Sequence, residues 1–134
     1  MGRTGVSRPA RYLHENNLLQ GRTLDYGSGR GYDADEYKLE RYDPHWHNIE
    51  PIGKFDTIMC NFVLNVIFEE EIETVIEKVK ALLNEGGVAY FTVRRDIPKE
   101  GWTLRGTYQH TVYLDLPIED DVENGYCMYR YGEC

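Results

Sequence analysis

The chain of 134 residues carries 15 Lys and Arg against 23 Asp and Glu, which gives a formal net charge of −8. This acidic balance disfavours nucleic acid as a partner, because binding to phosphates needs clustered positive charge. The length fits one domain over 1–134. The three cysteines are scattered, and no apolar run approaches the roughly 20 residues of a membrane span. Both features predict a cytoplasmic protein with reduced thiols.

The first predicted element is a short helix that begins after Ser7, a residue able to cap it, with Pro9 in its first turn. Two asparagines at 16–17 are expected to end it. A short β-prone strand then starts at 23–24 and runs into the turn 25–31, Asp-Tyr-Gly-Ser-Gly-Arg-Gly. A strand that ends in alternating glycines is typical of the first strand-to-helix turn of a doubly wound α/β domain.

Two short elements follow the glycine turn. Residues 32–37 leave room for at most two helical turns, and their acids suit the start of a helix. A second strand is predicted over 39–42, ending at Asp43 and Pro44, because proline disfavours continuation. Only about a dozen residues then precede the next strand, too few for another strand with its crossover helix. We therefore predict a loop and a sheet without its usual third strand.

The middle of the chain holds the clearest helix. Residues 55–60 predict a central buried strand. Apolar residues then recur at helical spacing from Ile72 to Leu83, with three glutamates at the start and two glycines at 86–87 after the end. Residues 88–93 are apolar and β-prone and predict a further buried strand.

The last third of the chain predicts an antiparallel hairpin. Residues 107–116 and 126–131 read as its strands, and the acidic run 119–125 as the turn between them. Proline and glycines between 95 and 106 argue against a helix before it. The whole pattern predicts an α/β fold with a mainly parallel sheet, helices on both faces and a closing antiparallel hairpin.

The glycine turn is the leading candidate for a ligand site, because glycines permit positive φ and close approach of a ligand to the main chain. A dinucleotide site needs G-x-G-x-x-G, and Tyr32 stands where the last glycine would be. Asp25 precedes the glycines and would repel a pyrophosphate, but suits a positively charged ligand group. The spacing thus disfavours a nicotinamide oxidoreductase; a purely structural turn is the other alternative.

An acid followed by G-x-G-x-G resembles the first motif of the class I S-adenosylmethionine-dependent methyltransferases, where the loop wraps the methionine end of the cofactor. The resemblance continues in order through Asp43, through 54–61 as the family's fourth strand, and through 82–91 as the end of a helix, a turn and the fifth strand. It covers about two thirds of the chain. It implies a Rossmann-like fold, S-adenosylmethionine as cofactor and methyl transfer as the activity, with the acceptor unidentified.

The resemblance also implies where the cofactor binds: at the glycine turn and at the ends of the second and fourth strands. The implied residues are Asp25, Tyr26, Gly27, Gly29, Gly31, Asp43, Pro44, Trp46, Asn61 and Phe62. Asp43 would accept hydrogen bonds from both ribose hydroxyls, although an Asp before proline is also a common turn residue. Trp46 would either stack on adenine or cover the core. The family's acid for the adenine amino group lies in the missing part.

Several other polar residues keep two interpretations. Asn65 either borders the cofactor or caps the next helix. Residues beyond the fifth strand that could face an acceptor are Arg94, Arg95, Trp102, Tyr108 and His110. His45 and His47 lack companions at ligand spacing, so we expect solvated loop residues and no metal site. Asn61 is followed by Phe-Val instead of the Pro-Pro-aromatic run of amino methylases, which removes the signature of DNA-base amino methylation.

Residues 7–9, 25–31, 43–44 and 63–67 are also similar to the small methyltransferase domains associated with DNA phosphorothioation islands. We therefore predict a compact methyltransferase with an unidentified acceptor and no identified catalytic residue. The alternative is a non-catalytic cofactor-binding or scaffolding module that works with a partner chain or as a homodimer. The chain's lack of a substrate-recognition insertion favours that alternative.

Overall fold

The computed structural model describes residues 5–104 and 106–132. Its elements in chain order are α1 (Arg8–Glu15), β1 (Thr23–Tyr26), α2 (Tyr32–Tyr37), β2 (Glu40–Tyr42), β3 (Phe55–Asn61), the 3-10 helix η1 (Leu64–Val66), α3 (Glu69–Ala81), β4 (Leu83–Arg94), β5 (Gly101–Trp102), β6 (Tyr108–Gln109), β7 (Ile118–Val122) and β8 (Tyr126–Tyr131). The main sheet has the strand order β2-β1-β3-β4-β8-β7, and β5 and β6 form a separate pair.

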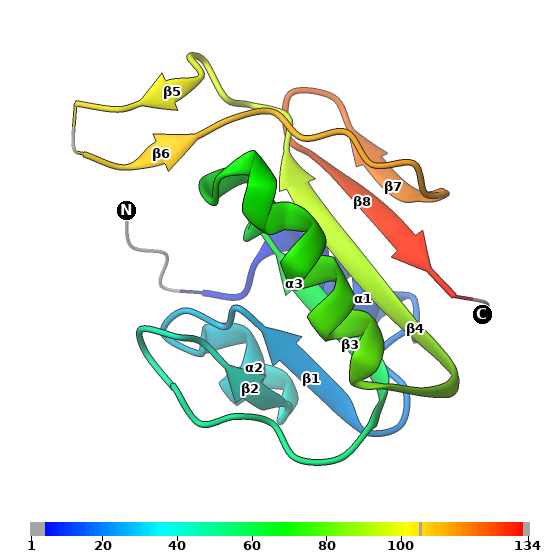
Figure 1. The fold of residues 1–134 in the computed structure, drawn as a ribbon. Helices are drawn as coiled ribbons and strands as arrows, with labels where there is room; N and C mark the ends of the chain where they lie inside the picture. Colours follow the sequence, from blue (N-terminus) through cyan, green and yellow to red (C-terminus); the bar gives the residue numbers. More distant parts are fainter. Residues whose placement is uncertain (1–4, 105, 133–134) are drawn as a thin grey trace.

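The strands β1 to β4 are parallel, and β8 runs antiparallel to both of its neighbours, β4 and β7. Figure 1 shows α3 lying along one face of this sheet, with the β5–β6 pair beyond the end at which β4 terminates. The predicted α/β sheet with a closing antiparallel hairpin is confirmed. The strands β1, β3 and β4 lie side by side inside the sheet. Because they are parallel, their carboxyl ends lie together along the same side of the sheet.

At the centre of the sheet both faces are buried, which explains why β3 reads as a nearly continuous apolar run. Alternate residues serve opposite layers: Ile58 packs in the cluster that includes Val79 of α3, while its neighbour Met59 packs in the cluster that includes Leu13 of α1. The predicted helices on both faces are thereby confirmed. The loops that follow the strands lie at the carboxyl ends of the strands, which the helices do not cover.

The N-terminal helix begins as predicted. The Ser7 Oγ accepts a hydrogen bond from the Ala10 N–H at 3.2 Å and donates one to Asp33 at 2.8 Å, and the Ser7 N–H donates to the other Asp33 oxygen at 2.7 Å. Ser7 and Asp33 are both buried. Since Asp33 lies in α2, one serine caps α1 and joins it to the helix that follows the glycine turn.

The missing third strand is also confirmed for the part of the chain that the structure describes. The edge of the sheet is β2, and residues 43–54 form a loop containing one isolated bridge between Asp43 and His47. The predicted short helix over 32–37 is present as α2. The shortened connections therefore move the sheet edge to β2, directly beside β1 and its glycine turn.

The predicted end of the long helix is wrong. It stops at Ala81, and β4 already starts at Leu83, well before the expected start at 88. The reason is pairing with the preceding strand: the Phe55 N–H donates to the Leu82 carbonyl at 2.7 Å, and Leu83 pairs with Phe55. A hydrogen-bonded strand partner thus ends the helix before its apolar periodicity runs out.

The predicted C-terminal hairpin has the wrong first strand. Residues 118–122, which include most of the expected acidic turn, form β7, whereas 110–116 form no strand. Because β7 lies at the edge of the sheet, its acidic side chains can reach water and do not prevent pairing. Residues 110–116 instead run beside α3, held by a 2.8 Å hydrogen bond from Arg95 to the Val112 carbonyl. No described residue after Arg94 is helical.

Candidate functional site

The glycine turn joins β1 to α2 and is fixed to the end of β2. The N–H groups of Gly27 and Ser28 both donate to the Tyr42 carbonyl, at 2.7 and 3.0 Å. Gly27, Gly29 and Gly31 all have positive φ, between 58° and 90°. This conformation favours glycine, so the spacing that identified the turn corresponds to three backbone positions that need it.

The three glycines differ in what surrounds them. A Cβ at Gly27 would collide with the Val63 side chain, and one at Gly31 would collide with the Arg41 guanidinium, whereas a Cβ at Gly29 would meet nothing within 4 Å. Gly27 therefore allows close packing inside the protein. Gly29 presents bare main chain to open space, which is the cradle expected if a ligand approaches the turn.

Asp43 holds the cradle in place. Its Oδ2 accepts a hydrogen bond from the Gly29 N–H at 2.8 Å, and its Oδ1 accepts from the N–H groups of His45 and Trp46 at 2.9 and 3.0 Å. A carboxylate offers about four acceptor positions. Three are used by main chain here, so Asp43 organises the turn and retains room for about one further hydrogen bond, fewer than the two expected with ribose.

Asp25 and Tyr26 end β1 beneath the turn and are both buried. The Tyr26 ring lies 5.0 Å from that of Tyr42, and burial together with this neighbour raises the pKa of Tyr26 to about 12. Burial also raises the pKa of the Cys60 thiol far above its ordinary value, with a further contribution from the charge of Asp25. Asp25 therefore lies near the neighbouring strand, below the surface of the turn.

Trp46 does not cover the core, because its side chain is 54% exposed. The Arg30 guanidinium of the glycine turn lies 4.9 Å from its ring centroid, and His45 meets the ring edge-on. One of the two interpretations of Trp46 is thus wrong. Its ring stands beside the turn, available for stacking on its open side, and the adjacent Pro44 is exposed as well.

At the end of β3, several buried polar atoms have no hydrogen-bond partner among the described residues. They are Oδ1 of Asn61, both side-chain polar atoms of Asn65, Oγ1 of Thr92 and, in the glycine turn, Oγ of Ser28. Buried polar groups are nearly always paired, so these atoms indicate a place where a ligand or ordered water belongs. Sequence reasoning named the two asparagines but missed Ser28 and Thr92, which no local pattern distinguishes.

Asn65 is not a helix cap. It lies in η1 with no exposed surface, and α3 begins after Phe68, whose N–H donates to the Glu71 side chain at 3.1 Å. The capping interpretation of Asn65 is therefore wrong. Phe62, which precedes η1, is half-buried and has a positive φ of 63°, an uncommon conformation for a bulky residue. The chain is thus bent sharply where β3 ends.

A cavity of about 470 Å³ adjoins this bend. Its lining comes from α1, the chain after β3, the end of β4 and the β7–β8 turn: Arg8, Phe62, Asn65, Val66, Arg94, Asp96, Gly125 and Tyr126. Of the residues predicted to face an acceptor, only Arg94 lines this cavity. Sequence reasoning missed Arg8 and Tyr126, because they come from opposite ends of the chain.

The remaining predicted acceptor-side residues lie elsewhere. Arg95 donates to the Val112 carbonyl and to the Tyr129 hydroxyl, both at 2.8 Å, and so anchors the chain beside α3. The exposed Trp102 and the half-buried Tyr108 form an aromatic cluster with Phe68, with ring centroids 4.8 to 6.0 Å apart. His110 contacts the Ile67 carbonyl at 2.8 Å.

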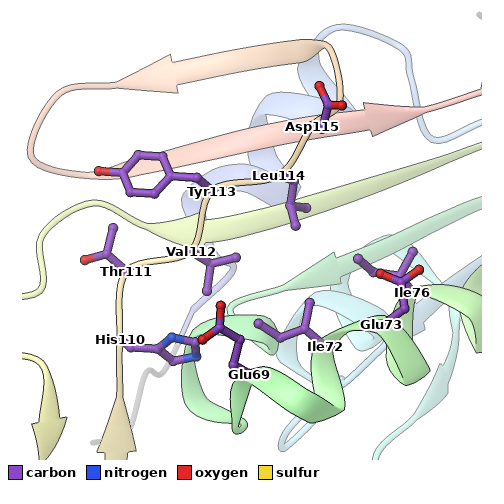
Figure 2. Close-up of a pocket in the computed structure, with 10 residues that line it drawn as sticks. All are labelled: Glu69, Ile72, Glu73, Ile76, His110, Thr111, Val112, Tyr113, Leu114 and Asp115. Carbon is purple, nitrogen blue, oxygen red and sulfur yellow. The ribbon is translucent and has the colours of Figure 1, made fainter.

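A second cavity, of about 510 Å³, lies between α3 and residues 110–115. Figure 2 shows Ile72, Val112 and Leu114 directed into this space, while Tyr113 points away from it. All of its lining residues belong to these two segments, and the glycine turn contributes none of them. We interpret it as the seam where an extended chain, rather than a helix, covers α3.

The described residues contain no group of three metal-binding side chains. None of their helices has the length and apolar character needed to cross a membrane. Cys60 and Cys127 are buried free thiols, and Cys134 lies outside the described residues.

No protein-family model matches the chain, and no curated protein matches it in sequence. Solved structures do match its fold. The Burkholderia thailandensis 1,6-didemethyltoxoflavin-N1-methyltransferase, solved with 1,6-didemethyltoxoflavin and S-adenosylhomocysteine, matches with a TM-score of 0.62 and 16% identity. That match covers 92% of this chain and 76% of the enzyme.

Two further structures match most of the chain. The PH0226 protein of Pyrococcus horikoshii OT3 has a TM-score of 0.61 at 15% identity, over 94% of this chain and 92% of that one. The magnesium protoporphyrin IX methyltransferase ChlM of Synechocystis PCC 6803, with bound S-adenosylmethionine, has a TM-score of 0.52 at 14% identity, over 91% and 74%. At such low identities these matches show the fold: it is the Rossmann-like fold of the class I S-adenosylmethionine-dependent methyltransferases.

Proposed function

For a chain with the class I methyltransferase fold, we propose that the glycine turn binds S-adenosylmethionine and that the protein transfers its methyl group to an acceptor. The single observation that carries the proposal is the cradle at Gly29, where bare main chain with φ of 58° faces open space and is held by Asp43. It lies at the carboxyl edge of parallel strands, where ligands bind in open α/β sheets.

The residues of this chain have distinct tasks in the proposed complex. The main chain around Gly29 contacts the methionine part, and Asp43 uses its remaining acceptor position for a ribose hydroxyl. The Trp46 ring has the Arg30 guanidinium over one face, and its open face would stack on the adenine. Asn61 and Phe62 border the cofactor where β3 ends. Asp25, Tyr26, Gly27, Gly31 and Pro44 support these contacts.

When bound, S-adenosylmethionine supplies an electrophilic methyl group on a sulfonium sulfur, so the protein chiefly needs to orient the reactants and to exclude water. A nucleophilic atom of the acceptor forms the new bond to the methyl carbon as the carbon–sulfur bond breaks. The sulfur keeps the electron pair and becomes a neutral thioether, and an acceptor proton passes to solvent or to a base.

Calorimetry with S-adenosylmethionine and with S-adenosylhomocysteine tests the cofactor proposal, with NAD as the control. We expect both sulfur compounds to bind and NAD to give no heat. A folded sample that binds NAD and neither sulfur compound would overturn the proposal. Transfer of radiolabelled methyl from the cofactor to a pool of small molecules then tests for catalysis.

A non-catalytic module is the second candidate. The observation that favours it is the aromatic cluster of Phe68, Trp102 and Tyr108, in which Phe68 and Trp102 are exposed and Tyr108 is half-buried, because exposed apolar patches often mark contacts with other proteins. Cofactor binding without methyl transfer to any pool, together with a stable complex at purification, would select this candidate.

A further inference from the structure

We propose that the cavity between α1, the end of β4 and the β7–β8 turn holds the methyl acceptor, and that this acceptor is a small carboxylate with an apolar, amide-bearing body. The proposal rests on the proposed function, since it assumes a cofactor at the glycine turn. The cavity's volume of about 470 Å³ falls within the range of small-molecule sites.

The position of the cavity suits transfer from the glycine turn. Phe62 lines the cavity, and the next residue, Val63, packs so closely on Gly27 that a Cβ there would collide with it. Two consecutive residues therefore connect the cavity to the turn: Phe62 forms part of the cavity wall, and Val63 contacts Gly27. Methyl transfer requires the two reacting atoms to lie next to each other, which this shared wall permits.

The charge of the cavity predicts an anionic group on the ligand. Arg8 and Arg94 line it against one acid, Asp96, in a chain whose net charge is −8. Arg94 donates its Nε–H to Asp96 at 2.7 Å, which leaves the remaining guanidinium donors of Arg94. Among the described residues, Arg8 has no carboxylate within ion-pair distance, and its guanidinium carbon lies 5.6 Å from the Tyr126 ring centroid. The hydrogen bond from Arg94 chiefly lowers the pKa of Asp96, and the charge of Arg8 contributes to lowering it. A carboxylate is the group that arginine binds with matched geometry.

The rest of the lining predicts the body of the ligand. Phe62, Val66 and the Tyr126 ring supply apolar surface. Asn65 has no exposed surface, and neither its Nδ2 nor its Oδ1 has a partner among the described residues. A carboxamide offers one donor group and one acceptor, so a secondary amide on the ligand would satisfy both. Inorganic anions would satisfy only the arginines.

Hippurate combines these features, with a carboxylate, a secondary amide and a phenyl ring, and hippuramide is its neutral counterpart. Titration of both into the protein saturated with S-adenosylhomocysteine tests the proposal. We expect hippurate to bind at least about 10-fold more tightly than hippuramide, as charge-assisted bonds to arginine require. Equal binding of the two, or no binding of hippurate, would overturn the assignment.

Four variants locate the site. Arg8→Met and Arg94→Met should each weaken hippurate binding about 5- to 10-fold and leave hippuramide within about twofold. Arg11→Met is the matched control, because Arg11 is an exposed arginine on the same helix outside the cavity, and should change nothing. Asn65→Leu should weaken both ligands equally without lowering the unfolding temperature, since it removes buried polar atoms that lack partners. An effect of Arg11→Met equal to that of Arg8→Met would rule out a defined site.

Competition separates this proposal from the one on which it rests. If hippurate displaces S-adenosylhomocysteine, the arginines belong to the carboxylate of the cofactor, and the acceptor assignment fails while cofactor binding stands. If S-adenosylhomocysteine does not bind and hippurate still depends on Arg8 and Arg94, the proposed function fails, and the cavity ceases to be an acceptor site. Simultaneous binding with the expected arginine dependence supports both.

Discussion

Gly29 and Gly27 are two residues apart in one turn, yet their environments assign them different roles. Gly27 packs against Val63, while Gly29 faces open space and donates its N–H to Asp43. A side chain at Gly27 would disturb packing, and any loss of binding would then be ambiguous. Gly29 is therefore the position at which substitution tests the ligand cradle itself.

We predict that Gly29→Val lowers affinity for S-adenosylhomocysteine by at least about 100-fold while the fold survives. The branched side chain would fill the space that the ligand needs, and the left-handed φ would add strain of roughly 1–2 kcal/mol. Calorimetry measures the affinity and thermal unfolding measures the stability. Gly86→Val is the matched control, because Gly86 also has a positive φ of 81° and nothing within 4 Å. If both variants bind S-adenosylhomocysteine equally well, the glycine turn only connects β1 to α2 and does not contact the ligand.

Asp43→Ala removes the acceptor of three main-chain N–H groups and of the proposed ribose contact. We expect the affinity for S-adenosylhomocysteine to fall by about 2–4 kcal/mol, roughly 30- to 1000-fold. Asp43→Asn should lose less, because the amide oxygen still accepts hydrogen bonds. The 2′-deoxy cofactor should bind the parent weakly and lose little more on mutation. Undiminished binding by the alanine variant would place the ribose elsewhere.

At the scale of elements, Ser7 connects α1 to α2. Ser7→Ala removes the hydroxyl that caps α1 and donates to Asp33. Loss of a serine cap typically costs 0.5–2 kcal/mol, and the buried bond to Asp33 adds to this, so we expect destabilisation of about 1–3 kcal/mol in urea unfolding. Ser7→Thr keeps a hydroxyl and should retain most of the stability. If alanine and threonine behave alike, the cap is not the source of the effect.

The elements that the sequence predicted well are those with their own local signals. Ser7 and Pro9 mark the start of α1, and the apolar spacing of α3 identifies the helix regardless of its partners. The glycine turn was also identified correctly, because positive φ leaves a trace in residue type. Local chemistry therefore predicted the helices, the parallel strands and the loop that replaces the third strand.

The elements that it predicted wrongly depend on distant partners. The strand β7 contains Asp120 and Asp121, which read as a turn, and only its edge position beside β8 explains a strand there. The β-prone residues 110–116 lie along α3 because Arg95 holds them. The residues that line the cavity could not be predicted for the same reason, because Arg8 and Tyr126 meet only in the folded chain.

At the scale of the whole molecule, two buried tyrosines, Tyr26 and Tyr126, and the half-buried Tyr12 predict how stability changes with pH. Burial chiefly raises the pKa of Tyr12 and Tyr26 to about 12, and burial with Asp120 raises the pKa of Tyr126 still further. Unfolded tyrosine ionises near 10. The folded state thus holds these protons more tightly, and the resulting stability is fully present below about pH 10 and lost as pH rises through 12.

We therefore expect the free energy of unfolding to be level from pH 7 to about 10 and to fall above it. Urea titrations followed by circular dichroism measure the free energy, and absorbance at 295 nm reports phenolate formation. Tyr26→Phe should make the decline shallower, because it removes one of the shifted groups. A profile that stays level to pH 12 would show that the tyrosines titrate equally in both states.

Both edges of the main sheet are short and charged. At one edge, Glu40 of β2 pairs with Arg22 at 2.5 Å, and at the other β7 carries three consecutive acids from Glu119 to Asp121. Charged, short edge strands discourage the addition of strands from other chains. The sheet is therefore protected from such addition at both of its edges, β2 and β7.

The packing of α1 has a consequence for how the protein is made. Leu13 and Ala10 of the first helix share a buried cluster with Tyr126 and Met128 of the last strand, and the Tyr12 hydroxyl donates to Glu119 at 2.8 Å. Domains form as units during synthesis at about 5–20 residues per second. Because α1 precedes β8 in the chain, it leaves the ribosome earlier and cannot complete its contacts until β8 has emerged, so the cavity between them forms late in the folding of this domain.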